Sequence, residues 1–144
     1  MTVAAILRHK GNDVVSVAPT VDVVELARTL SAKHIGAAVV QDTGRQLLGI
    51  VTERDLLHAI ATKGVAALGM TVAQLMTRAL TTVTPSTTVA EAMKLMTAGR
   101  FRHLPVVEDG KLLGIVSIGD VVKTRLEAQE GEVESLKAYV AGAA

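Results

Sequence analysis

The stretch LLGIVTERD at residues 47–55 decides the fold, because the chain repeats it as LLGIVSIGD at residues 112–120. Each copy begins as an apolar run typical of a buried strand, and ends in a hydroxyl residue followed three positions later by an aspartate. The copies lie 65 residues apart (120 − 55 = 65), and a second motif, VAPT at residues 17–20, returns as VTPS at residues 83–86. A period this long that occurs twice predicts a pseudo-twofold duplication rather than a solenoid, which needs three or more units.

The first repeat predicts the order strand, helix, strand, strand, helix. Asp22 and Glu25 form a capping pair at the start of the first helix. The predicted elements are a strand at 14–17, a helix from 23, strands at 37–40 and 47–51 around a turn at 42–44, and a helix closing at Gly64. The apolar residues of that last helix are Leu56, Leu57, Ile60 and Ala61.

The second repeat predicts the same elements in the same order. Thr88 and Glu91 form a capping box, and strands at 104–107 and 112–116 flank Asp109-Gly110, which is a strong hairpin signal. A short helix at 72–76, with Thr71 and Gln74 as its caps, has a counterpart at residues 2–7. We therefore expect an α/β (α+β) fold of two β-α-β-β-α repeats packed through their sheets. The expected division is 1–67 for the first repeat with an N-terminal helix, 68–124 for the second, and 125–144 for a helical tail.

The tail is charged and helical in pattern, with Gly131 as an interruption. Its possible apolar contacts are Leu126, Val133, Leu136 and Val140. The pattern fits a solvated helix that covers the module, and it also fits a helix that binds a partner.

Composition excludes several classes of function. The 144 residues are 49% hydrophobic and 20% charged, and no apolar run approaches the ~18 residues of a membrane span. A net charge of +1 and only two aromatic residues argue against nucleic-acid binding. The chain has no cysteine, and its histidines lack metal-ligand spacing, so we expect no metal site. We also expect a cytoplasmic protein. An enzyme is not expected, because no nucleophile–base set or phosphate-cradling loop is recognisable.

The two motif ends carry the chemistry that remains. Thr52 and Ser117 follow a strand directly, and Asp55 and Asp120 come three residues later, at the start of a helix. Helix capping explains this pattern. The hydroxyl accepts a hydrogen bond from a helix amide, and the negative carboxylate is stabilised by the positive end of the helix dipole. The same hydroxyl, amides and carboxylate could instead hold a ribose diol, and the residues alone leave both interpretations open.

The repeats resemble cystathionine-β-synthase (CBS) domains. The resemblance rests on Pro19, IGAAVV at 35–40 and LGIVTERD at 48–55 in the first repeat, and on FRHLPVV at 101–107 and LGIVSIGD at 113–120 in the second. A tandem pair of this kind, a Bateman module, would cover the chain to Val122. The resemblance implies binding of an adenosine-containing ligand: AMP, ADP, ATP, NAD(H) or S-adenosylmethionine.

The resemblance also implies two crossed sites, each completed by the other repeat. The first site would contain Ile50, Thr52, Arg54, Asp55, Arg102 and His103. The second would contain Gly36, Ala37, Ile115, Ser117 and Asp120. Each aspartate would hold ribose hydroxyls, each isoleucine would flank adenine, and Arg102 with His103 would contact phosphate. The second site would lack such an anion-binding pair.

The resulting hypothesis is a regulatory protein that senses an adenosine nucleotide and modulates a protein partner or its own assembly. The resemblance favours a homodimer whose two pairs meet through their helices as a flat disc. The alternatives are a dimerisation scaffold that binds no ligand, and a nucleotide-hydrolysing enzyme, against which the missing metal set and nucleophile argue.

Overall fold

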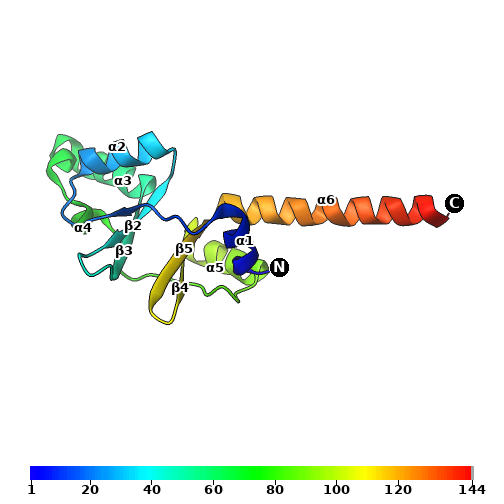
Figure 1. Ribbon diagram of the computed structural model, residues 1–144. Coiled ribbons are helices and arrows are strands. Elements are labelled where there is room, and N and C mark those ends of the chain that lie inside the picture. Colours follow the sequence, from blue (N-terminus) through cyan, green and yellow to red (C-terminus); the bar gives the residue numbers. More distant parts are fainter. Residues whose placement is uncertain (144) are drawn as a thin grey trace. The chain divides into compact units, whose positions relative to one another are not determined.

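The computed structural model describes residues 1–143, which form two compact units (Figure 1). The Asp55 unit comprises Asp13–Thr81, and the Asp120 unit comprises Met1–Asn12 with Thr82–Ala144. Each unit is a small sheet packed with helices, so the mixed α/β class predicted from the sequence is confirmed. The predicted packing of the repeats through their sheets stays a prediction.

The Asp55 unit is built on a sheet with the strand order β1-β2-β3. Strand β1 is parallel to β2, and β2 is antiparallel to β3. Its core joins Leu26 of helix α2 to Val40 and Val51 of the sheet and to Leu56 of helix α3. The elements are β1 Ser16–Val17, α2 Val23–Lys33, β2 Ala37–Gln41, β3 Leu47–Thr52, α3 Glu53–Lys63, the 3₁₀ helix η1 Gly64–Gly69, and α4 Val72–Leu75.

The Asp120 unit contains the antiparallel pair β4-β5. Asp109 and Gly110 both have positive φ, as a type I′ hairpin turn requires, so the predicted hairpin is confirmed. The predicted first strand of this repeat is reduced to one parallel bridge between Val83 and Val106. The elements are α1 Val3–Lys10, α5 Val89–Gly99, β4 His103–Glu108, β5 Lys111–Ser117, and α6 Ile118–Ala143.

Each unit contains the short helix that precedes the other repeat in the sequence. Helix α1 packs Val3 and Ile6 into the core of the Asp120 unit, with Leu104 of β4. Helix α4 packs Val72 into the core of the Asp55 unit. The expected ranges 1–67 and 68–124 follow the sequence repeat, whereas the Asp55 unit contains α4, which precedes the second repeat, and the Asp120 unit contains α1, which precedes the first.

Two helices differ from the sequence expectation. On α3 only Leu56 of the four predicted apolar residues is buried, while Leu57 is 69% and Ile60 48% exposed. Gly131 does not interrupt the tail, which is one continuous helix, α6. None of the helices in residues 1–143 is both long and apolar enough to cross a membrane.

Candidate functional site

The first motif forms a closed hydrogen-bonded turn where β3 meets α3. Thr52 is the N-cap of α3, and its Oγ1 accepts the amide of Asp55 at 3.3 Å. The Asp55 Oδ2 accepts the Thr52 amide at 2.8 Å and the Thr52 hydroxyl at 3.2 Å. These bonds form a capping box, so the carboxylate is fixed at the positive end of the helix.

The second motif repeats this arrangement where β5 meets α6. The Asp120 amide donates to Ser117 Oγ at 3.1 Å, and Asp120 Oδ2 accepts the Ser117 amide at 2.8 Å. The capping predicted from the sequence is therefore present in both repeats. The bonds that the carboxylates accept within both motifs end on the Oδ2 atom of each aspartate.

Lys10 makes the two carboxylates different. Its Nζ lies 2.7 Å from Asp120 Oδ2 and donates a second bond to the Ile115 carbonyl at 2.9 Å. The Lys10 and Asp120 side chains are 33% and 24% exposed, so the ion pair is only partly screened by water. The sequence analysis missed Lys10, because its reach depends on where α1 docks; its only sequence signal is a basic residue in the last turn of that helix.

The ion pair keeps Asp120 ionised. Partial burial would raise the pKa of the Asp120 carboxyl, but the hydrogen bonds from Lys10 and Ser117 and the charge of Lys10 outweigh it. The pKa of Asp120 consequently lies below its ordinary value of 3.8. An ionised carboxylate is acceptor-only, which suits the binding of a diol that donates two hydroxyl protons.

The start of the preceding strand lies beside each motif within the same unit. Ala37 pairs with Thr52 across β2 and β3, and the Gly36 carbonyl accepts the Glu53 amide at 2.9 Å. In the other unit, His103 pairs with Ser117 across β4 and β5. The Arg102 carbonyl there accepts the Ile118 amide at 2.8 Å.

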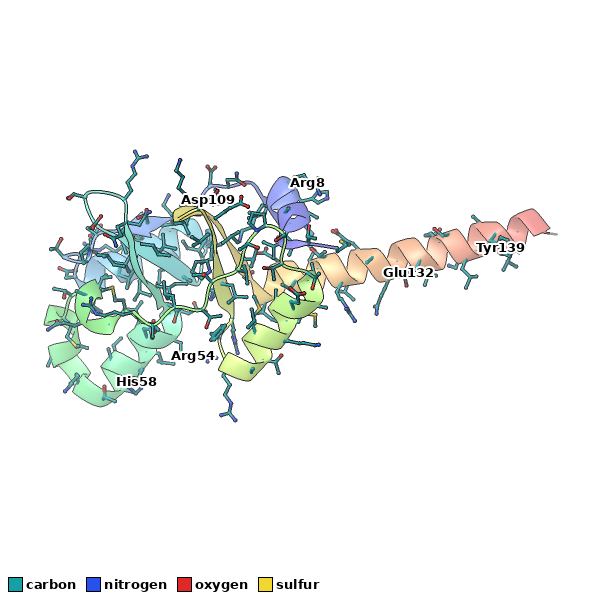
Figure 2. The ribbon with its side chains drawn as sticks, turned by 90° about the horizontal axis from the view of Figure 1, so that it is seen from below. Arg8, Arg54, His58, Asp109, Glu132 and Tyr139 are labelled. Atoms are coloured by element: carbon teal, nitrogen blue, oxygen red, sulfur yellow. The ribbon has the colours of Figure 1, made fainter. Side chains whose placement is uncertain are left out.

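The crossed assignment joins residues of different units and stays a prediction. The structure brings Gly36 and Ala37 together with the Asp55 motif, and Arg102 and His103 together with the Asp120 motif. Arg54 is exposed on the first turn of α3 (Figure 2). The predicted adenine neighbours Ile50 and Ile115 lie in β3 and β5, two residues before the capping hydroxyl.

The glycines of the two motifs allow another segment to cross each strand closely. A Cβ on Gly49 would lie 2.5 Å from the carbonyl oxygen of Thr77. The backbone of Thr77 forms two hydrogen bonds with the backbone of Ile50, one in each direction. A Cβ on Gly114 would lie 2.8 Å from Cδ2 of Leu7. The LGIV part of each motif thus serves packing, and the following S/T-x-x-D part fixes the carboxylate. In residues 1–143, no group of three metal-ligating side chains is placed to hold a metal ion.

Known proteins are similar to this chain in sequence and in fold. A model of the CBS domain matches residues 3–62 and again residues 72–127. The CBS domain-containing protein CBSX3, mitochondrial, of Arabidopsis thaliana is 41% identical over 124 residues, which are 83% of this chain and 60% of that protein. The chain therefore spans less than two thirds of the length of this relative.

Solved structures agree with the duplicated fold. The CBS-domain containing protein ATU1752 from Agrobacterium tumefaciens matches with a TM-score of 0.85 and 49% identity, over 87% of this chain and 99% of that one. The structure of CBSX2 in complex with AMP matches with a TM-score of 0.72 and 32% identity, over 89% and 98%. These findings confirm the resemblance predicted from the repeated motif. The chain belongs to the CBS domain family and carries two CBS domains in tandem.

Proposed function

We propose that this protein binds an adenosine-containing ligand and transmits its binding to a protein partner or to its own assembly. The observation that carries the proposal is the matched pair of carboxylates, Asp55 and Asp120, each held at a helix start by its own capping hydroxyl. Ribose presents two hydroxyl donors, and a charge-assisted hydrogen bond contributes roughly 1.5–3 kcal/mol. The similarity to CBSX2, whose structure contains AMP, supports the same ligand class.

The proposed first site joins Ile50, Thr52, Arg54 and Asp55 with Arg102 and His103, whose cationic or hydrogen-bonding groups suit a phosphate. The proposed second site joins Gly36 and Ala37 with Ile115, Ser117 and Asp120. Lys10 supplies this second site with a cation that the sequence analysis did not expect. Candidate ligands are AMP, ADP, ATP, NAD(H) and S-adenosylmethionine.

Thermal unfolding with these ligands and with adenosine tests the proposal. A ligand at 100 times its Kd should stabilise the protein by about 2.7 kcal/mol, which is a clear shift in Tm. Asp55→Asn and Arg102→Ala should weaken one common site, and Asp120→Asn a different one. Asp13→Asn, which removes the charge of an exposed aspartate outside both motifs, is the matched control.

The possible outcomes separate the hypotheses. If Arg102→Ala lost binding of phosphorylated ligands but still bound adenosine, the crossed first site would be supported. Unchanged binding of phosphorylated ligands by this variant would contradict it. Absence of any shift would favour the dimerisation scaffold. Product formed from ATP in an Asp55-dependent or Asp120-dependent manner would instead favour the hydrolysing enzyme.

We further propose a homodimer formed through the helices. Leu57 and Ile60 on α3 and Val65 on η1 are exposed, and they support an interface because the contact of large apolar side chains with water is unfavourable. The measurement is the molar mass by light scattering at several protein concentrations. A single monomeric mass at all concentrations would contradict this part of the proposal.

A further inference from the structure

Helix α6 carries an apolar stripe that its own unit does not cover. The stripe residues are spaced alternately by four and three, which is the heptad pattern of a coiled coil. The apolar residues among them are between 44% and 64% exposed. The apolar members are Val122, Leu126, Val133, Leu136 and Val140, with Gln129 at the remaining seam position.

The stripe lies on a different side of α6 from the docked face. Val121, which is fully buried in the core of the Asp120 unit, lies about 100° around the helix from Val122. Gly131 lies on the side opposite the stripe, where the absence of a side chain leaves the seam intact. Figure 1 shows the C-terminal part of α6 extending beyond α1 and α5 of its own unit.

This extended part needs a partner to persist as a helix. From Gln129 to Gly142 every side chain is exposed, so no packing within the unit supports this stretch. Isolated helices of about 12–15 residues are only marginally stable in water, and an internal glycine weakens them further. Glu132 and Tyr139 lie on this extended segment (Figure 2).

The charges beside the stripe identify the partner as a second copy of this chain. In a parallel, in-register pair, each g position lies beside the e position five residues on in the partner helix. Arg125 would then face Glu130 of the second copy, and Glu132 would face Lys137. Both pairs join opposite charges, and twofold symmetry forms each of them twice.

The antiparallel alternative is disfavoured by the same residues. An antiparallel pair that overlaps the whole stripe places e beside e and g beside g. Glu130 would then face Glu130 of the other copy, and Glu132 would face Glu132. We therefore propose that α6 forms a parallel, in-register, two-stranded coiled coil between two copies of the chain, with Gln129 fixing the register.

Single cysteines test the geometry, because the chain contains none of its own. Leu126→Cys and Val140→Cys should each form a disulfide with the same residue of the second copy under mild oxidation. Glu134→Cys, which lies away from the seam, is the control and should not. The two seam positions are about 21 Å apart along the helix, so an antiparallel pair could cross-link at most one of them. Circular dichroism confirms that each variant remains helical.

Charge reversal tests the pairing. Glu132→Lys should weaken cross-linking of Leu126→Cys by about tenfold, because two attractive pairs become repulsive. Adding Lys137→Glu should restore it, whereas Glu134→Lys, the same change of charge off the seam, should leave it unchanged. The proposal would be overturned if only one of Leu126→Cys and Val140→Cys cross-linked, if neither did, or if Glu134→Cys cross-linked as well. It would also be overturned if Lys137→Glu failed to restore cross-linking.

Discussion

Removal of the Lys10 ammonium should destabilise the Asp120 unit by about 1–2 kcal/mol at pH 7. The ammonium donates to Asp120 at 2.7 Å and to the Ile115 carbonyl at 2.9 Å. A charge-assisted bond contributes roughly 1.5–3 kcal/mol when water is excluded, and exposed ion pairs contribute about 0.2–1 kcal/mol. Since the two side chains are 33% and 24% exposed, the pair should fall between these limits. Lys10→Met keeps the length of the side chain and removes only its charge and its donors.

The contribution of the pair should disappear in acid. The pKa of Asp120 is lower in the folded protein than its ordinary value of 3.8, so the stabilisation is complete above that value. It is lost as the pH falls through the lower, folded pKa, where the carboxylate is protonated. The difference in stability between the natural chain and Asp120→Asn should therefore narrow below about pH 4.

A double-mutant cycle isolates this pair from other titrating groups. Urea unfolding of the natural chain, Lys10→Met, Asp120→Asn and the double variant should give a coupling free energy of about 1 kcal/mol at pH 7. Near pH 3 the coupling should be smaller than at pH 7, and Asp55→Asn combined with Lys10→Met should show none at either pH. A coupling that is absent at pH 7, or that is equal at the two pH values, would refute the reasoning.

The other predictions concern the stability of the two units and are measured by urea or thermal unfolding. Gly49→Ala should lower the free energy of unfolding by about 1–3 kcal/mol, because the new methyl group meets a backbone carbonyl that cannot rotate away. Gly114→Ala should lower it less, because its methyl group meets the end of a leucine side chain. Equal losses for the two variants would contradict this. Thr88→Ala should cost about 1 kcal/mol by removing the N-cap of α5, and Thr88→Ser, which keeps the hydroxyl, should cost much less. Leu104→Ala should cost about 2–5 kcal/mol, because the side chain is fully buried; a cost within 0.5 kcal/mol of zero would mean that the core is not packed as described.

Local features were predictable from the sequence because their interactions span three or four residues. The caps at Thr52, Ser117 and Thr88 each join a residue to the third residue after it. The Asp109-Gly110 turn needs positive φ at both positions, which these residue types adopt readily. The duplication itself is visible in the repeated motif, and the residues of that motif carry the resemblance to the family.

Features that join distant parts of the chain were decided by tertiary packing. The periodicity on α3 predicted an apolar face, yet only Leu56 of the predicted residues is buried, since which side of a helix faces a core depends on where the helix docks. The heptad spacing of α6 is present in the sequence. Only the structure shows that the side of α6 carrying Val121 is buried and that the apolar stripe is exposed.

By itself, the amino-acid order determined the two repeats, their caps and turns, and the two aspartates that carry the candidate chemistry. Only the folded chain revealed that Lys10 reaches Asp120 across 110 positions and that helix α1, at the start of the sequence, packs into the unit formed by the second repeat. The physical reason is that hydrogen bonds within a turn are dictated by neighbouring residues. An ion pair between remote residues forms only after apolar burial has brought their elements together.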